Sequence, residues 1–397
     1  MAERGPGARA PRIWVTGGVT GGVTGGVVSG CHLGYPAPAI ARESDMQLNG
    51  AMLASLRAGL KTTAGAAAMA AWRRGKTVAA LLALVAASAT GSAAQQAFPS
   101  RPITIVVPAA AGGPTDTVAR LIAEPMGRTL GQQIVVENVG GAGGTIGVGR
   151  VAKAAADGYT LLVWHIGQST APALYDNLRY DVFNDFDPIG RITDVPMTIV
   201  GKKSLAAKDI GELIAWLRAK QDQVTYAHAG IGSAAHLCGL MLMSALNIKM
   251  NAVVYRGTGP AMNDLVGEQF DMMCDQTTGT ANQIKAGTIR GFAATTKTRI
   301  ALLAELPTLD EAGVKGFEVS AWHALWGPKG LPSEVLQKLT AALQGALQEP
   351  VVIERMAGLA TVPVAQDLAT PAALKAQLEL EVAKWGSVIR AAGVKAN

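Results

Sequence analysis

Cysteine and histidine are scarce in this chain, with three and five copies in 397 residues. Cys31 lies in the N-terminal leader, and Cys238 and Cys274 form neither a C-x-x-C pair nor a metal-ligand spacing. The histidines that follow the leader are His165, His228, His236 and His323. They are too scattered for a recognisable metal motif. The sequence therefore predicts no metal site and no cofactor.

Aromatic residues make up only 5% of the chain, and no cluster of Lys and Arg is interleaved with them. The formal net charge of +6 arises in residues 1–94, which hold nine basic and three acidic side chains, so the remaining chain is formally neutral. A neutral body without a basic, aromatic patch lacks the electrostatic footprint of a nucleic-acid-binding protein. We therefore expect no nucleic-acid partner.

Long apolar runs are also missing, because the only candidate spans about fourteen residues, 77–90, where a bilayer needs about twenty. It follows the basic stretch 72–76 (WRRGK) and precedes the small residues Ser92, Ala93 and Ala94. This order is typical of a signal peptide, which we place at 69–94, and it predicts export to the periplasm of a Gram-negative cell. An N-terminal anchor and a buried helix are the alternatives.

Residues 1–68 include the low-complexity segment VTGGVTGGVTGGVV and show no stable periodicity. We expect this stretch to be disordered or to reflect a start assigned too far upstream, with Met46, Met52 or Met69 as the true start. In an oxidising periplasm Cys238 and Cys274 could form a disulfide. Two buried, unpaired cysteines are the favoured expectation.

From Phe98 onward, short β-branched runs alternate with amphipathic stretches, which predicts an α/β fold with a parallel sheet covered by helices. Residues 103–107 form the first expected strand, and apolar residues recur at helical spacing over 118–130. Pro125 should kink or split that helix, and Gly131 should end it. Further strands are expected at 134–137, 159–165, 224–227, 252–255, 270–274 and 289–295.

Two segments are expected to cross between lobes. The first comprises 186–192 and 198–201, and the second is 318–326. They divide the chain into a first lobe of residues 98–198 plus 319–397 and a second lobe of residues 199–318. Helices beginning near Pro332, Pro350 and Thr370 should pack on the first lobe. Two lobes joined by two crossings predict a hinge.

Three loops of small residues, 110–116, 140–147 and 229–233, follow strands and lead into helices. Glycine lets the backbone approach an anion closely, and the N–H groups at a helix start have no internal partner. A carboxylate is therefore a natural ligand beyond the carboxyl ends of these strands. Alternatively, Asp116 and Ser233 are only N-caps and the glycines only turns.

Nucleotide binding and hydrolysis are less well supported by the sequence. A G-x-G-x-x-G pattern that starts at Gly141 fails at Ile146, and no Walker sequence is present. A nucleophile elbow around Ser169 lacks its closing glycine, because Ala171 stands there. Ser233 and His236 share one helix face, which suits capping better than a catalytic triad, and no third orienting group is identifiable.

The successive blocks RPITIVVPAAAGGPTDTVAR, GQQIVVENVGGAGGTIG, YAHAGIGSAAHLCG, VVYRGTGPAMNDLVGEQFDMMCD and FEVSAWHALWGPKGLP resemble the Bug family, the extracytoplasmic receptors of tripartite tricarboxylate transporters. The resemblance runs from Phe98 to the end of the chain. It implies a type II periplasmic-binding-protein fold, two α/β lobes with a ligand cleft between them. It also implies a monomer that captures a small organic carboxylate for integral membrane transporter subunits and catalyses no reaction.

The resemblance also implies a set of ligand contacts. They are Gly113, Pro114, Thr115, Asp116, Thr145 and Ser169 in the first lobe and His228, Gly230, Ser233, His236 and Asp275 in the second. This chain departs from the family at Ala109, Trp164, His165 and His228, on which ligand identity should depend. A histidine contact would make the affinity depend on pH. A receptor coupled to signalling and an exported hydrolase on a similar scaffold remain the alternative functions.

Overall fold

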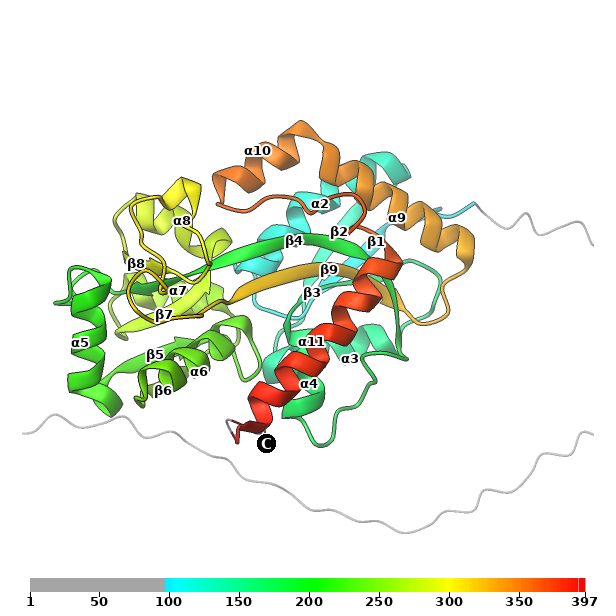
Figure 1. Cartoon of the computed structure of the whole chain (residues 1–397). Helices are drawn as coiled ribbons and strands as arrows, with labels where there is room; N and C mark the ends of the chain where they lie inside the picture. The colour runs from blue at the N-terminus through cyan, green and yellow to red at the C-terminus, as the bar shows by residue number, and fades with distance from the viewer. Residues whose placement is uncertain (1–96, 392, 397) are drawn as a thin grey trace, which may run out of the picture. The chain divides into compact units, whose positions relative to one another are not determined.

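This computed structural model describes residues 97–391 and 393–396 (Figure 1). The strands, in chain order, are β1 (Ile103–Val107), β2 (Ile134–Asn138), β3 (Thr160–His165), β4 (Phe186–Gly201), β5 (Thr225–His228), β6 (Asn251–Val254), β7 (Met272–Gln276), β8 (Arg290–Ala294) and β9 (Ser320–Pro328). The predictions for the leader, 1–94, lie outside the described residues.

Helices alternate with these strands along the chain. They are α2 (Pro114–Leu130), α3 (Thr145–Ala152), α4 (Gly167–Leu174), α5 (Ile210–Lys220), α6 (Ala234–Leu246), α7 (Thr258–Val266), α8 (Thr277–Lys285), α9 (Ser333–Gln348), α10 (Pro350–Gly358) and α11 (Pro371–Ala391), with short 3-10 turns at Ala142–Gly144, Gln221–Gln223 and Ala301–Leu303. The alternation of short strands and helices is the one that the sequence predicted. The α4 helix was missed.

The strands follow the order β2-β1-β3-β9-β4-β7-β5-β6, and β8 pairs with β4. Strand β1 runs parallel to β2 and β3, and β5 runs parallel to β6 and β7. Strand β4 pairs antiparallel with β9 as far as Pro196 and with β7 from Met197 to Gly201. One continuous strand, predicted as two pieces, thus belongs to both halves of the sheet.

Strands β4 and β9 lie side by side and join the two lobes (Figure 1). Just before β9, the N–H of Val319 still bonds to Thr295 O in the second lobe. Helices α9 and α11 pack on the first-lobe side, as expected, with α9 against α2 and β4 and α11 against α4 and β4. The predicted α/β architecture of two lobes and two crossover strands is confirmed.

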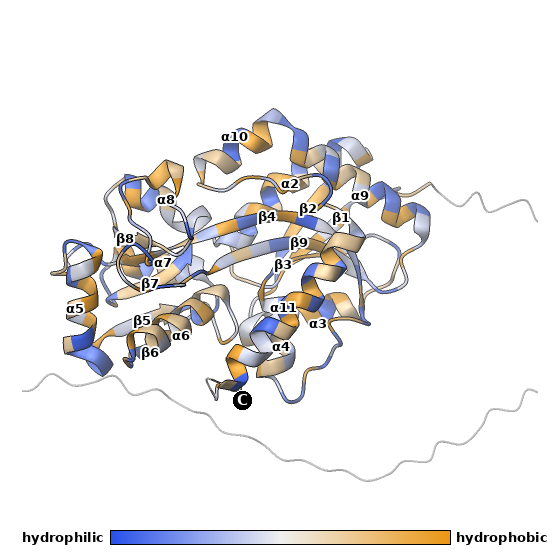
Figure 2. Ribbon diagram, in the orientation of Figure 1, coloured by the Kyte–Doolittle hydropathy of each residue, from blue (hydrophilic) through white to orange (hydrophobic). Residues whose placement is uncertain are grey.

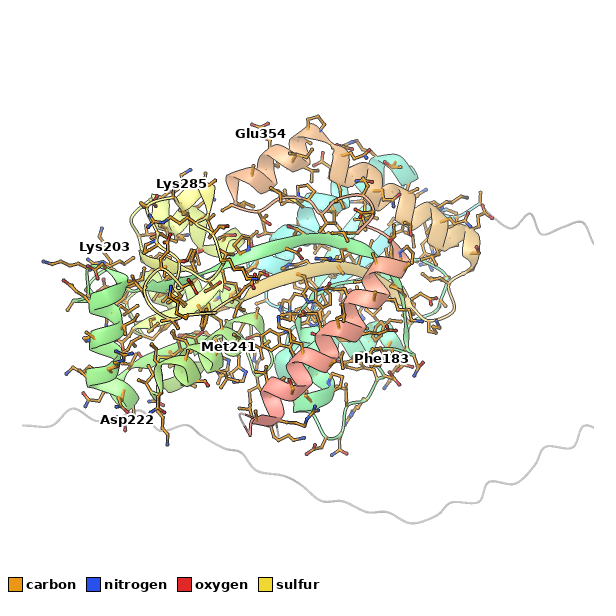
Figure 3. The ribbon with its side chains drawn as sticks, viewed as in Figure 1. Phe183, Lys203, Asp222, Met241, Lys285 and Glu354 are labelled. Atoms are coloured by element: carbon orange, nitrogen blue, oxygen red, sulfur yellow. A yellow bond between two sulfur atoms is a disulfide. The ribbon has the colours of Figure 1, made fainter. Side chains whose placement is uncertain are left out.

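The residues of β1 alternate between two hydrophobic cores. Ile105 and Val107 pack with residues of α2, α9 and α10, whereas Val106 packs in the core beneath α3, α4 and α11. Since both faces of the strand are buried, four of its five residues are apolar, and the exception, Thr104, is only half-buried. The covering helices, such as α9, have both apolar and polar residues (Figure 2), and charged side chains such as Lys203, Lys285 and Glu354 lie on the surface (Figure 3).

Two expectations need correction. Helix α2 is continuous through Pro125, so the proline does not split it, and Gly131 ends it in a left-handed conformation as predicted. Cys238 and Cys274 form a disulfide, so the favoured expectation of unpaired thiols was wrong. Helix α6 packs on β7 and brings the two Cα atoms within 6.1 Å, a separation usual for disulfides but not readable from sequence spacing.

Candidate functional site

A cavity of about 380 Å³ lies where the loops of the two lobes meet. The first lobe contributes residues 108–109, 113–115, 141–144, Trp164 and Tyr175. The second contributes residues 229–231, Ser233, 254–256, Thr258 and Gln276. The volume is in the range of small-molecule sites, and most of the wall belongs to loops that follow parallel strands. Trp164 lies within β3, Tyr175 follows α4, and Ala396 near the C-terminus completes the wall.

The starts of five helices reach this cavity. Its wall includes the N-cap residues of α2, α3, α6 and α8, which are Gly113, Gly144, Ser233 and Gln276, and the first residue of α7, Thr258. Only α6 is capped by a side chain, the Oγ of Ser233, which accepts from the N–H of His236. The uncapped starts leave backbone N–H donors and positive dipole ends around one space.

The charges of the residues that line the cavity agree with the arrangement of the helix starts. Arg256 is the only charged side chain among the residues that line the cavity, and none of them is acidic. Backbone donors at the helix starts, and a basic residue with no acidic one among the lining residues, favour an anionic guest.

Loops from the two lobes touch around the cavity. A Cβ atom on Gly143 would lie 2.2 Å from Ile231 O, and one on Gly259 would lie 2.6 Å from Ala111 O. The Thr170 hydroxyl donates to Gly232 O at 3.1 Å, which also joins the lobes. The cavity is therefore enclosed by backbone from both sides, and closing it depends on residues without side chains.

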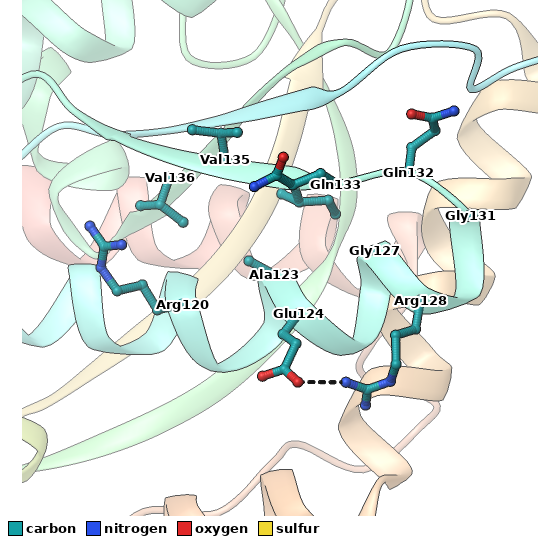
Figure 4. A pocket seen from close by; sticks show the side chains of 11 residues that line it. Arg120, Ala123, Glu124, Gly127, Arg128, Gly131, Gln132, Gln133, Val135 and Val136 are labelled. Atoms are coloured by element: carbon teal, nitrogen blue, oxygen red, sulfur yellow. Dashed lines mark hydrogen bonds and ion pairs between the residues drawn. The ribbon is translucent and has the colours of Figure 1, made fainter.

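A larger hollow of about 730 Å³ lies on the surface between α2 and β2 (Figure 4). Arg128 there bonds to Glu124 and Glu349, and Arg120 bonds to Asp116. The hollow includes Gly131 at the C-terminal end of α2, where the dipole repels anions. Its cations are already paired, so it is a poor carboxylate site.

The family model of the tripartite tricarboxylate transporter family receptor matches residues 118–394. A UPF0065 protein from the TAR-I ttuE-ttuC' intergenic region of Agrobacterium vitis is 54% identical over 300 residues, 76% of this chain and 87% of its own. This chain belongs to the tripartite tricarboxylate transporter receptor family.

Solved structures agree with this assignment. The periplasmic binding protein BugD superposes with a TM-score of 0.74 at 48% identity, covering 75% of this chain and 99% of its own. MatC from Rhodopseudomonas palustris, solved with bound malate, gives a TM-score of 0.71 at 38% identity and covers 74% and 100%. The receptor thus has the fold of a periplasmic solute-binding protein.

Five of the predicted contact residues line the cavity of this receptor: Gly113, Pro114, Thr115, Gly230 and Ser233. The hydroxyl of Thr115 also lies 3.2 Å from His323 Nε2, so it links the cavity wall to strand β9. Ser233 is an N-cap as well as a wall residue, so the two interpretations of this loop are compatible.

The other six predicted residues lie outside the wall. Asp116 accepts from the N–H of Gly112 and from Arg120, and therefore fixes the first loop. The hydroxyl of Thr145 donates to Ala142 O, and that of Ser169 donates to Ile166 O. Asp275 is buried just behind the wall.

His228 and His236 fix the third loop from behind. Nδ1 of His228 accepts from the N–H of Gly230, and Nδ1 of His236 accepts from the N–H of Gly232, both at 3.2 Å. Burial lowers the pKa of His228, and lowers that of His236 to about 3, so both rings are neutral near pH 7. Protonating either Nδ1 would break its bond to the loop.

Four further residues line the cavity for which no role was predicted from the sequence: Tyr175, Arg256, Thr258 and Gln276. The segment 256–260 (RGTGP) has the same small residues before a helix as the three recognised loops, so that pattern could have identified it. Trp164, noted as a departure from the family, does lie on the wall, whereas His165 lies behind it. In the described residues no three His, Cys, Asp or Glu side chains group as a metal site, and no helix could cross a membrane.

Proposed function

We propose that this receptor binds a small organic carboxylate in the cavity between its lobes and delivers it to integral membrane subunits of a tripartite tricarboxylate-type transporter. The observation on which the proposal rests is the set of helix starts from both lobes around one cavity without acidic side chains. The malate bound to MatC, which is 38% identical to this chain, supports a carboxylate guest.

In this proposal the ligand contacts Gly113, Pro114, Thr115, Gly230 and Ser233 directly. Asp116, His228 and His236 position the two loops, and Thr145 and Ser169 support neighbouring backbone. Lobe one comprises 98–198 and 319–397, lobe two comprises 199–318, and β4 and β9 form the hinge. The receptor acts as an exported periplasmic monomer, in keeping with its family and with the relatives described as periplasmic.

Catalysis forms no part of this proposal. The hydroxyls of Ser169 and Ser233 bond to backbone groups, and no imidazole accepts from either among the hydrogen bonds of the described residues. A serine hydrolase needs that nucleophile–base pair. A receptor that signals would share the same cavity, so only its membrane partner would differ.

A thermal-shift screen tests the proposal. Mono-, di- and tricarboxylates and aromatic acids are added to the purified receptor, followed by calorimetry of those that stabilise it. A true ligand at a hundredfold excess over its Kd stabilises the folded state by about 2.7 kcal/mol. The acid should be recovered unchanged. Failure of every acid to bind, or its conversion to product, would contradict the proposal.

A further inference from the structure

A second hollow, of about 520 Å³, lies on the first lobe between residues 145–153 and the segment 175–180 that follows α4. We call it the α3 groove, since α3 and its C-cap residue form one side. Ala142 and Tyr175 line both this groove and the interlobe cavity, so the two spaces adjoin. Whatever occupies the groove therefore lies beside the place where the ligand is held.

The charged side chains that line the α3 groove are all basic: Arg150, Lys153 and Arg179. Arg150 bonds to both carboxylate oxygens of Glu137, so its charge is already paired. Lys153 and Arg179 are exposed, and neither forms an ion pair with another described residue. Because the chain after the leader is formally neutral, two unpaired cations in one groove are a local excess of positive charge.

The acidic side chains closest to this segment in the sequence are engaged elsewhere. Asp176 pairs with Lys395 at 2.5 Å. Asp181 accepts from the N–H groups of Phe183 and Asn184, so it closes its own turn. Neither carboxylate lines the α3 groove. The groove therefore has no counter-charge of its own for Lys153 and Arg179.

The lining of the α3 groove also contains a buried hydroxyl. Tyr180 is 7% exposed, and its hydroxyl bonds to no other described residue. Burial raises the pKa of Tyr180, and the neighbouring Tyr175 adds to the effect, so the hydroxyl keeps its proton. A buried hydroxyl left unpaired costs free energy, and a protonated phenol can donate to a carboxylate. Tyr180 therefore favours a guest that carries acceptors, as the two cations do.

The shape of the groove favours an extended guest. Thr145 and Lys153 both line it, and eight residues of helix correspond to about 12 Å along the axis. Ile146, which is 56% exposed, and the half-buried Leu178 add apolar surface to the same lining. A single small anion would pair one cation and leave the apolar surface uncovered. A peptide segment with carboxylates and apolar side chains matches both features.

We propose that the α3 groove docks an extended acidic segment of a partner protein, whose carboxylates pair with Lys153 and Arg179 and accept from the hydroxyl of Tyr180. The chemistry of the segment follows from the groove. Only the identity of the partner, a membrane subunit of the transporter, rests on the proposed function. Docking here places the partner beside the cavity from which it receives the ligand.

Fluorescence anisotropy with the purified receptor tests the proposal. The probe is a labelled octapeptide of six glutamates and two leucines, and its comparison peptide has glutamine in place of every glutamate. We expect the acidic peptide to bind at least about tenfold more tightly than the glutamine peptide at low salt, and to weaken as salt screens the exposed ion pairs. Equal affinities for the two peptides, or no binding of the acidic one, would overturn the proposal.

Variants locate the binding on the groove. Lys153→Gln combined with Arg179→Gln should weaken the acidic peptide about fivefold or more, because two exposed ion pairs are lost. Lys203→Gln combined with Arg218→Gln is the matched control, since it removes the same two charges from exposed positions of the second lobe (Figure 3). The control should keep Kd within about twofold. An equal loss in both double variants would show nonspecific attraction and overturn the assignment to the groove.

Tyr180→Phe removes only the hydroxyl and should weaken the acidic peptide about threefold. Inorganic pyrophosphate and phosphatidylglycerol vesicles are the competing guests. Tighter binding of either than of the acidic peptide would assign the groove to a small anion or a lipid surface and refute the proposal. The groove variants should bind the best carboxylate of the screen as wild type does, since Lys153 and Arg179 lie outside the cavity wall. If no carboxylate binds wild type, the proposed function fails, whereas the peptide result still decides the groove.

Discussion

At the residue scale, backbone distances between the lobes explain why the cavity loops are built from glycine. Gly143 has a φ of +61°, and Ile231 O from the other lobe would lie 2.2 Å from a Cβ atom there. Gly144 next to it has a φ of +96° and lies against the ring of Trp164. Neither position tolerates a side chain without moving its neighbours.

Gly143→Ala should therefore weaken ligand binding at least tenfold, because the added methyl group separates the lobes where they must meet. Gly149→Ala is the matched control on α3, since its Cβ would meet only Tyr180 at an ordinary 3.6 Å. Calorimetry with the best acid of the screen measures both variants. Unchanged affinity in Gly143→Ala would show that the contact with Ile231 is not needed for binding.

Near neutral pH, titration should come from Asp275 and not from the histidines. Burial lowers the pKa of all four described histidines, so their rings are neutral near pH 7. Burial raises the pKa of Asp275 to about 7. Among the groups with a resolved pKa shift, Tyr226 is the one affected by the charge of Asp275. Burial raises the pKa of Tyr226, so its hydroxyl stays neutral.

The contribution of Asp275 to the stability of the ligand-free receptor should consequently fall as pH rises from about 4 to about 7, whereas the buried histidines contribute in the opposite direction. Over that window folded Asp275 holds a proton that the unfolded chain, with a pKa of 3.8, has released. Asp275→Asn removes this dependence, so its free energy of unfolding relative to wild type should rise with pH by a few kcal/mol. Urea denaturation at pH 4.5, 6 and 8 measures the difference. If the free energies of unfolding of wild type and Asp275→Asn changed with pH in parallel, the raised pKa of Asp275 would be contradicted.

At the element scale, the disulfide joins two parts of the second lobe that serve the cavity. Cys238 lies in α6, whose N-cap Ser233 is on the wall, and Cys274 precedes Asp275 and Gln276. Tyr226 reinforces the same junction, since its hydroxyl donates to Ala235 O and accepts from the N–H of Cys274. The bond therefore fixes the spacing between two helix starts.

Replacing both cysteines by alanine should lower the free energy of unfolding by about 3–4 kcal/mol, because the bond closes a loop with a sequence separation of 36 residues. Chemical denaturation of the variant and of wild type measures this loss. Dithiothreitol reduces the disulfide when wild type unfolds, so it should lower the free energy of unfolding of wild type. It should leave that of the double alanine variant unchanged. A loss below about 1 kcal/mol would show that packing alone holds α6 on β7.

Most of the elements could be predicted from the sequence, because strands buried on both faces are continuous apolar runs and helices show a 3.6-residue period. Helix α4 was missed since it is only eight residues long, contains Pro172 and shows little periodicity. Pro125 was expected to kink or split α2, but the helix continues through it, with Pro125 on a buried face.

The site could be predicted only in part, because its polar side chains are placed by tertiary contacts. Small residues before a helix identify backbone that reaches the cavity, as at Gly113 and Gly230. They do not show which nearby polar side chains face the cavity and which brace the loop, as Asp116 and His228 do. That division depends on tertiary contacts with Arg120 and the glycine backbone, which no spacing in the sequence records.

At the scale of the whole molecule, the crossover strands and the cavity wall are in direct contact. Strands β4 and β9 connect the lobes, and the hydroxyl of Thr115 on the cavity wall lies beside His323 of β9. A ligand that bonds to helix starts on both sides stabilises the closed arrangement by its differential affinity for it.

A crystal structure with the tightest-binding acid of the screen tests the central claim most directly. We expect the acid in the interlobe cavity, with carboxylate oxygens about 2.7–3.2 Å from backbone N–H groups at the starts of α2 or α3 and of α6, α7 or α8. An acid held in the hollow between α2 and β2, or bound by one lobe alone, would contradict it.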